Sequence, residues 1–285
     1  MFAQPSFLKN PEINHRHYLQ LLGFLSSTYW EDTEMYVGKP LFRLPEFSIN
    51  NATIDDLDIH EYLRLGNRLE RFFSFIIKQS ERYEMVAENI QIISNKVTLG
   101  ELDFLIKDRK KNEIIHVELA GKLYLYSPNY TTELERWIGP NLKDTLQRKL
   151  IKLKDRQFPL LYQQDTIKIL KSLGVNTDVI SQKMCMKIRQ FLPWKMHELP
   201  ALAFRNNIKG YYVNSRDFQD DYFRGHQYFM PEKQDWIVAP EYCEVWMTYK
   251  KILKKIKNMH NQHQSPMIWL KKDNKTYETF FVTFW

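Results

Sequence analysis

The chain has 285 residues, of which 44% are hydrophobic and 14% aromatic. This is long enough for one large domain or two ordinary ones, and apolar enough to exclude a disordered protein. The mean hydropathy of −0.50, and the lack of any apolar run of membrane-spanning length, argue against a membrane protein. The first residues lack the basic and apolar regions of a signal peptide, so we expect a cytoplasmic protein.

The charge balance favours a polyanionic partner. Lys and Arg number 41 against 34 Asp and Glu, which gives a net charge of +7. A basic surface attracts nucleic acid through phosphate contacts and counterion release. The two cysteines, Cys185 and Cys243, have no histidines near them at zinc-binding spacing, so we expect reduced thiols in the core rather than a zinc site.

The N-terminal third predicts two helices separated by an extended connection. A helix is expected over residues 13–29, and residues 38–58 hold the glycine, prolines and polar tract of a connection. From Ile59 to Gln79 the apolar spacing is helical again. One stripe of that helix consists of Tyr62, Leu65, Leu69, Phe72 and Ile76. Glu70 lies beside the stripe, where a partly buried carboxylate needs a partner.

Three strands are predicted next, at Met85–Ser94, Thr98–Ile106 and Ile114–Tyr126. Successive side chains of a strand point to opposite faces. Val117, Leu119, Leu123 and Leu125 therefore share one face of the third strand, and His116, Glu118, Ala120, Lys122 and Tyr124 share the other. The charged turn at 107–112 is typical of antiparallel neighbours, so Asp103 and Glu118 are expected to converge on one patch of sheet.

Two converging carboxylates repel each other unless a cation lies between them, and a divalent metal with oxygen ligands is the usual solution. Asp103 and Glu118 therefore point to a metal-dependent site for phosphodiester cleavage. Of the neighbouring polar residues, we expect Glu101 to be solvated and His116 to be bonded to the backbone rather than to act as a ligand.

Further elements complete a mixed sheet. After a loop at 127–140, a helix is predicted from Pro140 or Asn141 to about Lys154, with Leu142 among its buried residues. Asp144 is expected to strengthen the first turn of that helix. A helix at Asp165–Leu173 and a strand at Met184–Phe191 follow. Beyond these we predict a helix at Tyr242–Met259, with Trp246 on its apolar face and a solvated lysine face, and a docked strand at 280–285.

This order of elements resembles the PD-(D/E)XK nuclease superfamily, and more closely the bacterial domain-of-unknown-function family 1853. The closer resemblance lies in 65–70 (LGNRLE), 100–104 (GELDF), 116–124 (HVELAGKLY) and 137–141 (WIGPN), followed by a helix with Lys149. It implies an α/β fold with a restriction-endonuclease-like core, an α-β-β-β-α-β mixed sheet, at 59–192. Residues 1–58 would form an N-terminal helical extension and connection, and 193–285 an α+β C-terminal segment packed on the core.

The resemblance also implies roles for individual residues. Asp103 and Glu118 would bind Mg²⁺ or Mn²⁺, Glu70 would complete or orient the metal shell, and the Leu119 carbonyl is a further oxygen ligand. The superfamily's lysine, two residues after the second acid, is replaced here by Ala120. Lys122 is the favoured substitute because it shares the strand face of Glu118, and Lys149 or Lys143 on the next helix is the alternative. Weaker candidate contacts to nucleic acid are Lys143, Arg148, Lys149 and Lys152.

The sequence therefore predicts a metal-dependent phosphodiesterase, a nuclease acting on DNA or RNA by water attack on phosphate. Mg²⁺ uses few carboxylates and takes phosphate oxygens as further ligands, which suits this chemistry. The alternative is a catalytically silent nuclease-like domain that binds nucleic acid or a protein partner, and the displaced lysine favours it. No glycine-rich phosphate loop follows any predicted strand, which disfavours a doubly wound nucleotide-binding fold.

Overall fold

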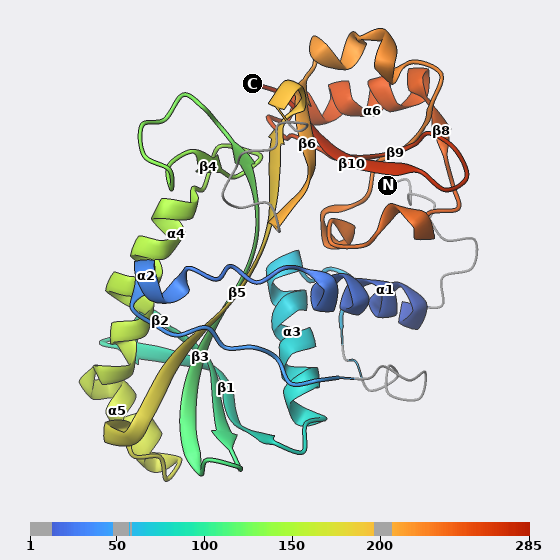
Figure 1. Ribbon diagram of the computed structural model, residues 1–285. Helices are drawn as coiled ribbons and strands as arrows, with labels where there is room; N and C mark the ends of the chain where they lie inside the picture. Colours follow the sequence, from blue (N-terminus) through green and yellow to red (C-terminus); the bar gives the residue numbers. More distant parts are fainter. Residues whose placement is uncertain (1–12, 48–56, 58, 197–206) are drawn as a thin grey trace.

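The computed structural model describes residues 13–47, 57, 59–196 and 207–285. Its helices are α1 Ile13–Ser26, α2 Thr33–Val37, α3 Leu65–Lys78, α4 Leu146–Lys152, α5 Gln164–Ser172 and α6 Tyr249–His260. Its strands are β1 Tyr83–Ser94, β2 Val97–Asp108, β3 Glu113–Tyr126, β4 Trp137–Ile138, β5 Ile180–Pro193, β6 Ile208–Asn214, β7 Gln227–Phe229, β8 Met247–Thr248, β9 Met267–Lys271 and β10 Tyr277–Thr283. These elements form a mixed α/β fold around one large sheet (Figure 1).

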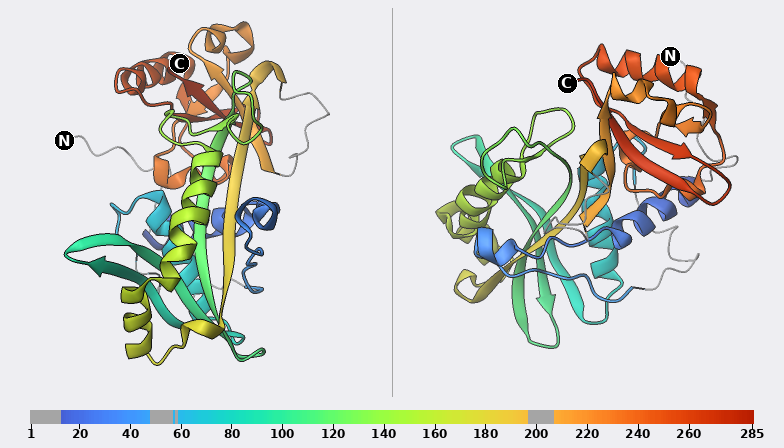
Figure 2. Two further views of the ribbon diagram at one scale, coloured as in Figure 1. Left: turned by 90° about the vertical axis from the view of Figure 1, so that its left-hand side faces the viewer. Right: turned by 45° about the horizontal axis from the view of Figure 1, so that its top comes forward.

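The first part of the sheet has the predicted strand order. β1, β2 and β3 are successive antiparallel neighbours, and β5 lies parallel to β3. α1 and α3 cover one face of these strands, whereas α4 and α5 cover the other (Figures 1 and 2). The side chains of β3 alternate as expected: Val117 and Leu119 pack in the core under α3, while Ala120 and Tyr124 pack in the core under α4.

The sheet continues into the C-terminal segment. β6 pairs parallel with β5, and the order then runs β6-β10-β9-β7-β8. The predicted C-terminal strand is confirmed, because β10 lies between β6 and β9 with Phe280 and Phe281 buried. The predicted domain boundary at residue 193 falls at the end of β5, where strand pairing carries on across it.

α3 begins six residues later than predicted, because a side chain takes the carbonyl groups that a longer helix would have used. The guanidinium of Arg68 donates to the backbone oxygens of His60, Glu61 and Leu63, at 3.3, 2.6 and 3.0 Å. Residues 59–64 are therefore held as a turn in front of the helix. The prediction for Tyr62 was wrong: its side chain is 92% exposed rather than part of the buried stripe.

α4 also begins later than predicted, at Leu146 instead of Pro140 or Asn141. Residues 139–144 form a tight turn in which the Gly139 N–H donates to the Asp144 carbonyl at 2.7 Å. Leu142 has a positive φ of 60° and is 46% exposed, so the prediction that it is buried was wrong. Thr145 caps the helix by accepting a hydrogen bond from the N–H of Arg148. The chain then passes through a π turn at Leu153–Gln157 and a 3₁₀ turn at Phe158–Tyr162.

The other predicted boundaries differ in detail. α6 begins at Tyr249, so Trp246 lies before the helix rather than on its face. The N-terminal helix ends at Ser26 instead of residue 29, and the short helix α2 follows it. Residues 38–47 of the predicted connection run beside β5, where the Phe42 N–H donates to the Met184 carbonyl. Residues 48–56 and 58 of that connection lie outside the described residues.

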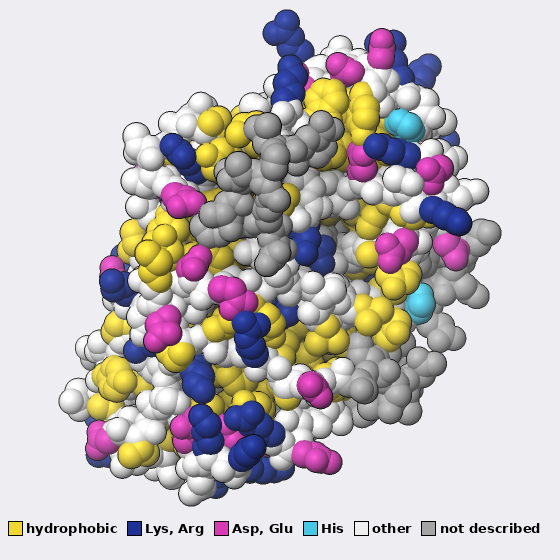
Figure 3. Space-filling view, in the orientation of Figure 1, with side chains coloured by type: hydrophobic (Ala, Val, Ile, Leu, Met, Phe, Trp, Pro, Cys, Tyr) yellow, Lys and Arg dark blue, Asp and Glu magenta, His cyan; other side chains and the backbone are white. Residues whose placement is uncertain are grey.

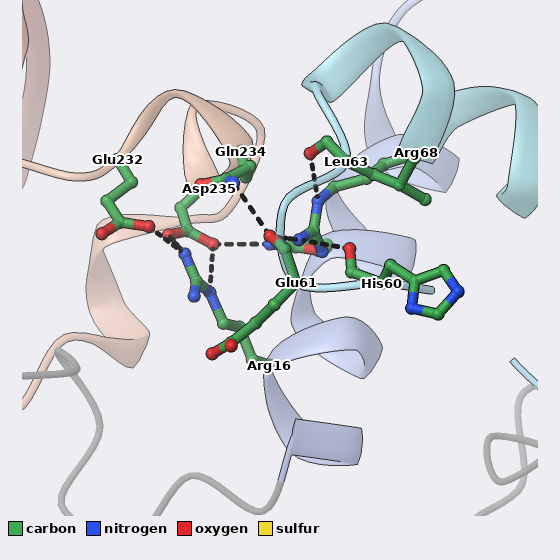
Figure 4. Close-up of polar contacts among 9 residues, drawn as sticks. Arg16, His60, Glu61, Leu63, Arg68, Glu232, Gln234 and Asp235 are labelled. Carbon is green, nitrogen blue, oxygen red and sulfur yellow. Dashed lines mark hydrogen bonds and ion pairs between the residues drawn. The ribbon is translucent and has the colours of Figure 1, made fainter. Parts of the chain in front are cut away.

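A buried ionic network fastens the C-terminal segment to α1 and α3 (Figure 4). Asp235 is fully buried and accepts hydrogen bonds from Arg16 at 2.6 and 3.0 Å and from Gln20 at 2.7 Å. Gln20 in turn accepts a hydrogen bond from Arg68 of α3. Arg16 also pairs with the more exposed Glu232. The loop around residues 232–236 is thereby held in a defined position against the core.

The composition raised expectations about the surface charge and about the cysteines. Basic and acidic side chains are interspersed over the face shown in Figure 3, so the net positive charge is not gathered there into one patch. Cys185 and Cys243 are both free and buried, as predicted. Across the residues that the structure describes, no helix has the length and apolar character needed to cross a membrane.

Candidate functional site

Pairing of β2 with β3 brings Asp103 and Glu118 together. The antiparallel ladder ends with Phe104 opposite Val117, and the next residues outward are Asp103 and Glu118. One oxygen of Asp103 accepts a hydrogen bond from the Leu119 N–H at 2.8 Å. The Glu118 carboxyl is hydrogen-bonded to both the backbone and the side chain of Asp103. The two acids therefore form one joined pair, as their positions on neighbouring strands predict.

Glu118 is oriented by side chains from three elements. Its Oε1 lies 2.9 Å from His116 Nε2, and its Oε2 accepts a hydrogen bond of 2.6 Å from the Gln157 amide. The Gln182 amide donates to His116 Nδ1 and to the Phe158 carbonyl. Because Nδ1 accepts, the ring proton lies on Nε2 and points at Glu118. The expectation that His116 bonds to the backbone was wrong.

The acids and the histidine have strongly shifted pKa values. Burial, and then the charge of Glu118, raises the pKa of Asp103 to about 7. Burial raises the pKa of Glu118 to about 8, and burial lowers the pKa of His116 to about 4, so its ring is neutral at pH 7. These shifts favour the protonated form of both carboxyl groups near neutral pH, because both are desolvated and Asp103 is also repelled by the charge of Glu118.

Glu70 is a third acid near this pair. It lies on α3, and its pKa is raised to about 7 by burial and then by the charges of Asp103 and Glu101. Glu101 is half-buried rather than fully solvated. Within the described ranges, no three His, Cys, Asp or Glu side chains are arranged to hold a metal ion. Glu70 therefore lies beside the joined pair without completing a three-residue metal shell.

The available donors suit a hard divalent cation. Asp103 and Glu118 offer carboxylate oxygens, and the Leu119 carbonyl belongs to the residue whose N–H holds Asp103. Mg²⁺ is commonly bound by one or two carboxylates, with water and phosphate oxygens completing its shell. An oxygen-only donor set also favours Mg²⁺ or Mn²⁺ over softer metals. The pair therefore fits such an ion, with solvent and substrate as the remaining ligands.

The two candidate lysines have different surroundings. Lys122 Nζ lies 2.7 Å from an oxygen of Asp144, and both side chains are about one-third exposed. Asp144 therefore pairs with Lys122 in the loop before α4. Lys149 donates to Gln157 at 3.1 Å, and Gln157 donates to Glu118. Burial lowers the pKa of Lys149, and the charges of Asp103 and Glu118 oppose that change. Lys149 is thus the lysine that is electrostatically coupled to the acid pair.

A groove of about 680 Å³ lies beside the pair. Its walls come from the first turns of α3, the second half of β3, the loop before α4 and the C-terminal loop 233–236. The basic residues that line it are Arg64, Lys122, Lys143, Lys149 and Lys233, and the acidic residues are Glu70 and Asp144. Of the predicted nucleic-acid contacts, Lys143 and Lys149 line the groove, whereas Arg148 and Lys152 are exposed on α4 outside it.

Several residues of this site carry no clear signal in the sequence. Gln157 reaches Glu118 because the π turn after α4 redirects the chain, and Gln182 reaches His116 from the neighbouring parallel strand. Lys233 and Trp236 come from the C-terminal segment, more than 100 residues from either acid. These residues reach the site because distant segments pack together, and a local sequence pattern does not reveal such packing.

The chain belongs to a family defined by a domain of unknown function, DUF1853, whose model matches residues 25–279. The match extends from the end of α1 to β10, so it includes the acid pair, the groove and the C-terminal segment. No curated protein and no solved structure matches the chain.

Proposed function

We propose that this protein is a divalent-metal-dependent phosphodiesterase that cleaves nucleic acid, DNA or RNA. The observation that carries the proposal is the joined carboxyl pair of Asp103 and Glu118 beside a groove lined by five basic side chains. Buried carboxyl groups with pKa values raised to about 7 and 8 favour a cation. Basic side chains along the neighbouring groove favour a phosphate-containing substrate.

The fold supports placing the protein within the PD-(D/E)XK nuclease-like superfamily. The order α3-β1-β2-β3-α4-β5, with β5 parallel to β3, matches the α-β-β-β-α-β core that the sequence resemblance implies. The two acids also lie on the second and third strands of this series, which is where the resemblance puts them. This superfamily assignment forms part of the proposal.

In the proposed mechanism, Asp103 and Glu118 would hold the metal, which when bound polarises the phosphate and lowers the pKa of the attacking water. His116 and Gln157 hold Glu118 in one orientation through both of its oxygens. The Leu119 N–H holds one oxygen of Asp103. The protein thereby fixes both ligand side chains before a substrate arrives, which reduces the reorganisation needed for reaction.

We assign the lysine role to Lys149 rather than to Lys122. Lys149 is linked to Glu118 through Gln157 and interacts with both acids, whereas Lys122 is paired with Asp144. A lysine with a lowered pKa, placed beside the acid pair, can position the attacking water or take its proton. Helix α4 would thereby supply the lysine that the superfamily has on β3, at the position of Ala120.

A second candidate function is a nuclease-like domain that binds nucleic acid without cutting it. Ala120 at the usual lysine position favours this alternative, as does the absence of a three-residue metal-binding cluster among the described residues. In that case the basic groove would bind phosphates, and the acids would serve the fold alone.

A cleavage assay distinguishes the two functions. Labelled single- and double-stranded DNA and RNA are incubated with the protein, in Mn²⁺ or in EDTA. We expect metal-dependent cutting that Asp103→Asn and Glu118→Gln abolish, while the exposed Glu133→Gln variant cuts like the wild type. Binding of the same probes without any cutting in Mn²⁺ would contradict the proposed activity and support the silent domain.

A further inference from the structure

The wall of the groove presents an aromatic ring to solvent. Tyr62 lies in the turn before α3 and is 92% exposed, although it lines the groove. The turn that carries it is held by the Arg68 guanidinium through the carbonyl groups on both sides of Tyr62 (Figure 4). A large exposed ring on a fixed backbone is a suitable platform for stacking against a nucleic-acid base.

The C-terminal loop joins this wall. Gln234 donates to the Glu61 carbonyl at 3.1 Å, next to Tyr62 (Figure 4). Lys233 lines the groove from the same loop, with its ammonium 5.5 Å from the centre of the Trp236 ring. One hydrogen bond therefore links the segment that carries Tyr62 to the segment that carries Lys233.

The basic side chains on the rim are close enough to influence one another. Arg64, Lys143 and Lys233 are exposed. Lys233 is only partly surrounded by protein, but this partial burial, and then the charges of Lys122, Arg64 and Lys143, lower its pKa. Asp144 compensates Lys122 by a direct ion pair. Mutually repelling cations on one rim are stabilised by a bound polyanion, and a nucleic-acid backbone supplies successive phosphates.

The exposed ring of Tyr62 favours one form of that polyanion. About 680 Å³ is within the usual range of a pocket for a small molecule, roughly 300–1,000 Å³. The bases of an intact double helix are paired and stacked on one another, so they are not available to stack on a side chain. A single strand can place both its phosphates and an unstacked base there.

We propose that this groove binds a single-stranded segment of nucleic acid, with its phosphates along Arg64, Lys143 and Lys233 and one base stacked on Tyr62. The inference rests on the proposed function, because such a strand would be presented to Asp103 and Glu118 for cleavage. It names the substrate class, and it assigns the C-terminal loop to substrate binding.

Fluorescence anisotropy in EDTA tests binding without cutting. The probes are labelled 12-nucleotide single strands of DNA and of RNA, and their duplexes. We expect either single strand to bind at least about tenfold more tightly than its duplex. Tyr62→Ala should weaken single-strand binding at least about fivefold, since stacking on an aromatic side chain contributes about 1–3 kcal/mol per base. Lys233→Ala should reduce the salt dependence by about 0.7 in log–log slope, which corresponds to one phosphate contact on a single strand.

Lys251→Ala, an exposed lysine on α6 outside the groove lining, is the matched control and should bind like the wild type. Duplexes that bind as tightly as single strands, or Tyr62→Ala and Lys233→Ala variants that match this control, would overturn the inference. If duplexes are cut in Mn²⁺ with these variants unaffected, the inference fails and the proposed function stands. Selective single-strand binding in EDTA with no cutting in Mn²⁺ supports the groove and overturns the proposed cleavage.

Discussion

Asp103 and Glu118 illustrate how a few side chains can couple protonation to metal binding. In an unfolded chain both carboxyl groups titrate near pH 4, but in the fold their pKa values rise to about 7 and 8. Between about pH 4 and pH 8 the folded protein therefore holds protons on these two carboxyl groups that the unfolded chain has released. The free energy of unfolding of the metal-free protein therefore falls as pH rises from about 4 to 8, and metal binding above pH 7 offsets that loss.

Asp103→Asn tests this coupling, because it removes one charge of the pair and keeps the shape of the side chain. In EDTA at pH 8 we expect the variant to melt above the wild type, by about 2–4 °C for each kcal/mol of relieved repulsion. Its melting temperature should also fall less between pH 6 and pH 8. Thermal unfolding at both pH values, with and without Mn²⁺, gives the result. A variant that melts lower at pH 8 with an unchanged pH dependence would mean that Asp103 is structural.

The two lysines can be separated by kinetics. Lys149→Ala should lower the turnover number by about 10²–10⁴-fold, the usual effect of removing a positioned acid–base group. Lys122→Ala removes a partner of Asp144 that is about one-third exposed, and it should have a much smaller effect. Single-turnover cleavage of a labelled strand in Mn²⁺ measures both variants. A larger loss of turnover in Lys122→Ala would show that Lys122, the residue that the sequence pattern favours, has the lysine role.

At the scale of elements, two helical glycines have opposite surroundings. A β-carbon on Gly23 of α1 would lie 2.2 Å from the Ile237 carbonyl oxygen, which belongs to the backbone of the C-terminal segment. A β-carbon on Gly66 of α3 would meet no atom within 4 Å. Close packing explains the first glycine, whereas the second faces the groove. The same substitution should therefore have opposite effects at the two positions.

Gly23→Ala should lower the free energy of unfolding by about 1–3 kcal/mol or more, because backbone atoms do not move aside as readily as a side chain. Gly66→Ala should be neutral, or raise that free energy by up to about 1 kcal/mol through better helix propensity. Urea denaturation of both variants measures the two effects. Equal changes in the two variants would show that helix propensity, rather than packing against Ile237, decides the outcome.

At the scale of the whole molecule, the network around Asp235 joins α1, α3 and the C-terminal segment. Its partners lie on α1, and through Gln20 it connects to Arg68 on α3. These contacts span more than 200 residues of sequence. They also position the loop that supplies Lys233 and Gln234 to the groove, so the same buried charges support both the fold and the binding surface.

Asp235→Ala should cost about 3–5 kcal/mol of unfolding free energy, because it removes the buried acceptor of Gln20 and leaves the partly buried Arg16 with Glu232 alone. Lys168→Ala, which breaks an exposed pair with Asp165, is the control and should cost less than about 1 kcal/mol. Chemical denaturation followed by tryptophan fluorescence compares the two variants. A cost below that of the control would show that the network contributes little to holding the segments together.

The sequence by itself determined the first three strands of the sheet and the acid pair. Alternation over 114–126 fixes which side chains of β3 face each core, and the short charged turn before it forces β2 and β3 to pair. Asp103 and Glu118 therefore meet because two strands that are adjacent in the sequence pair across a short turn. Strand register is strongly specified wherever a face is buried, since a slip of one residue would expose the apolar side chains.

Only the tertiary structure decided where the helices begin and which residues surround the acids. Arg68 makes α3 begin only at Leu65 by binding the carbonyl groups before it, and the Gly139–Asp144 turn makes α4 begin later than predicted. Gln157 reaches Glu118, with Lys149 behind it, and Lys233 reaches the groove, because distant segments pack on one another. Periodicity records which face of an element is apolar, whereas capping by distant side chains and the packing of one segment on another depend on the three-dimensional arrangement of the whole chain.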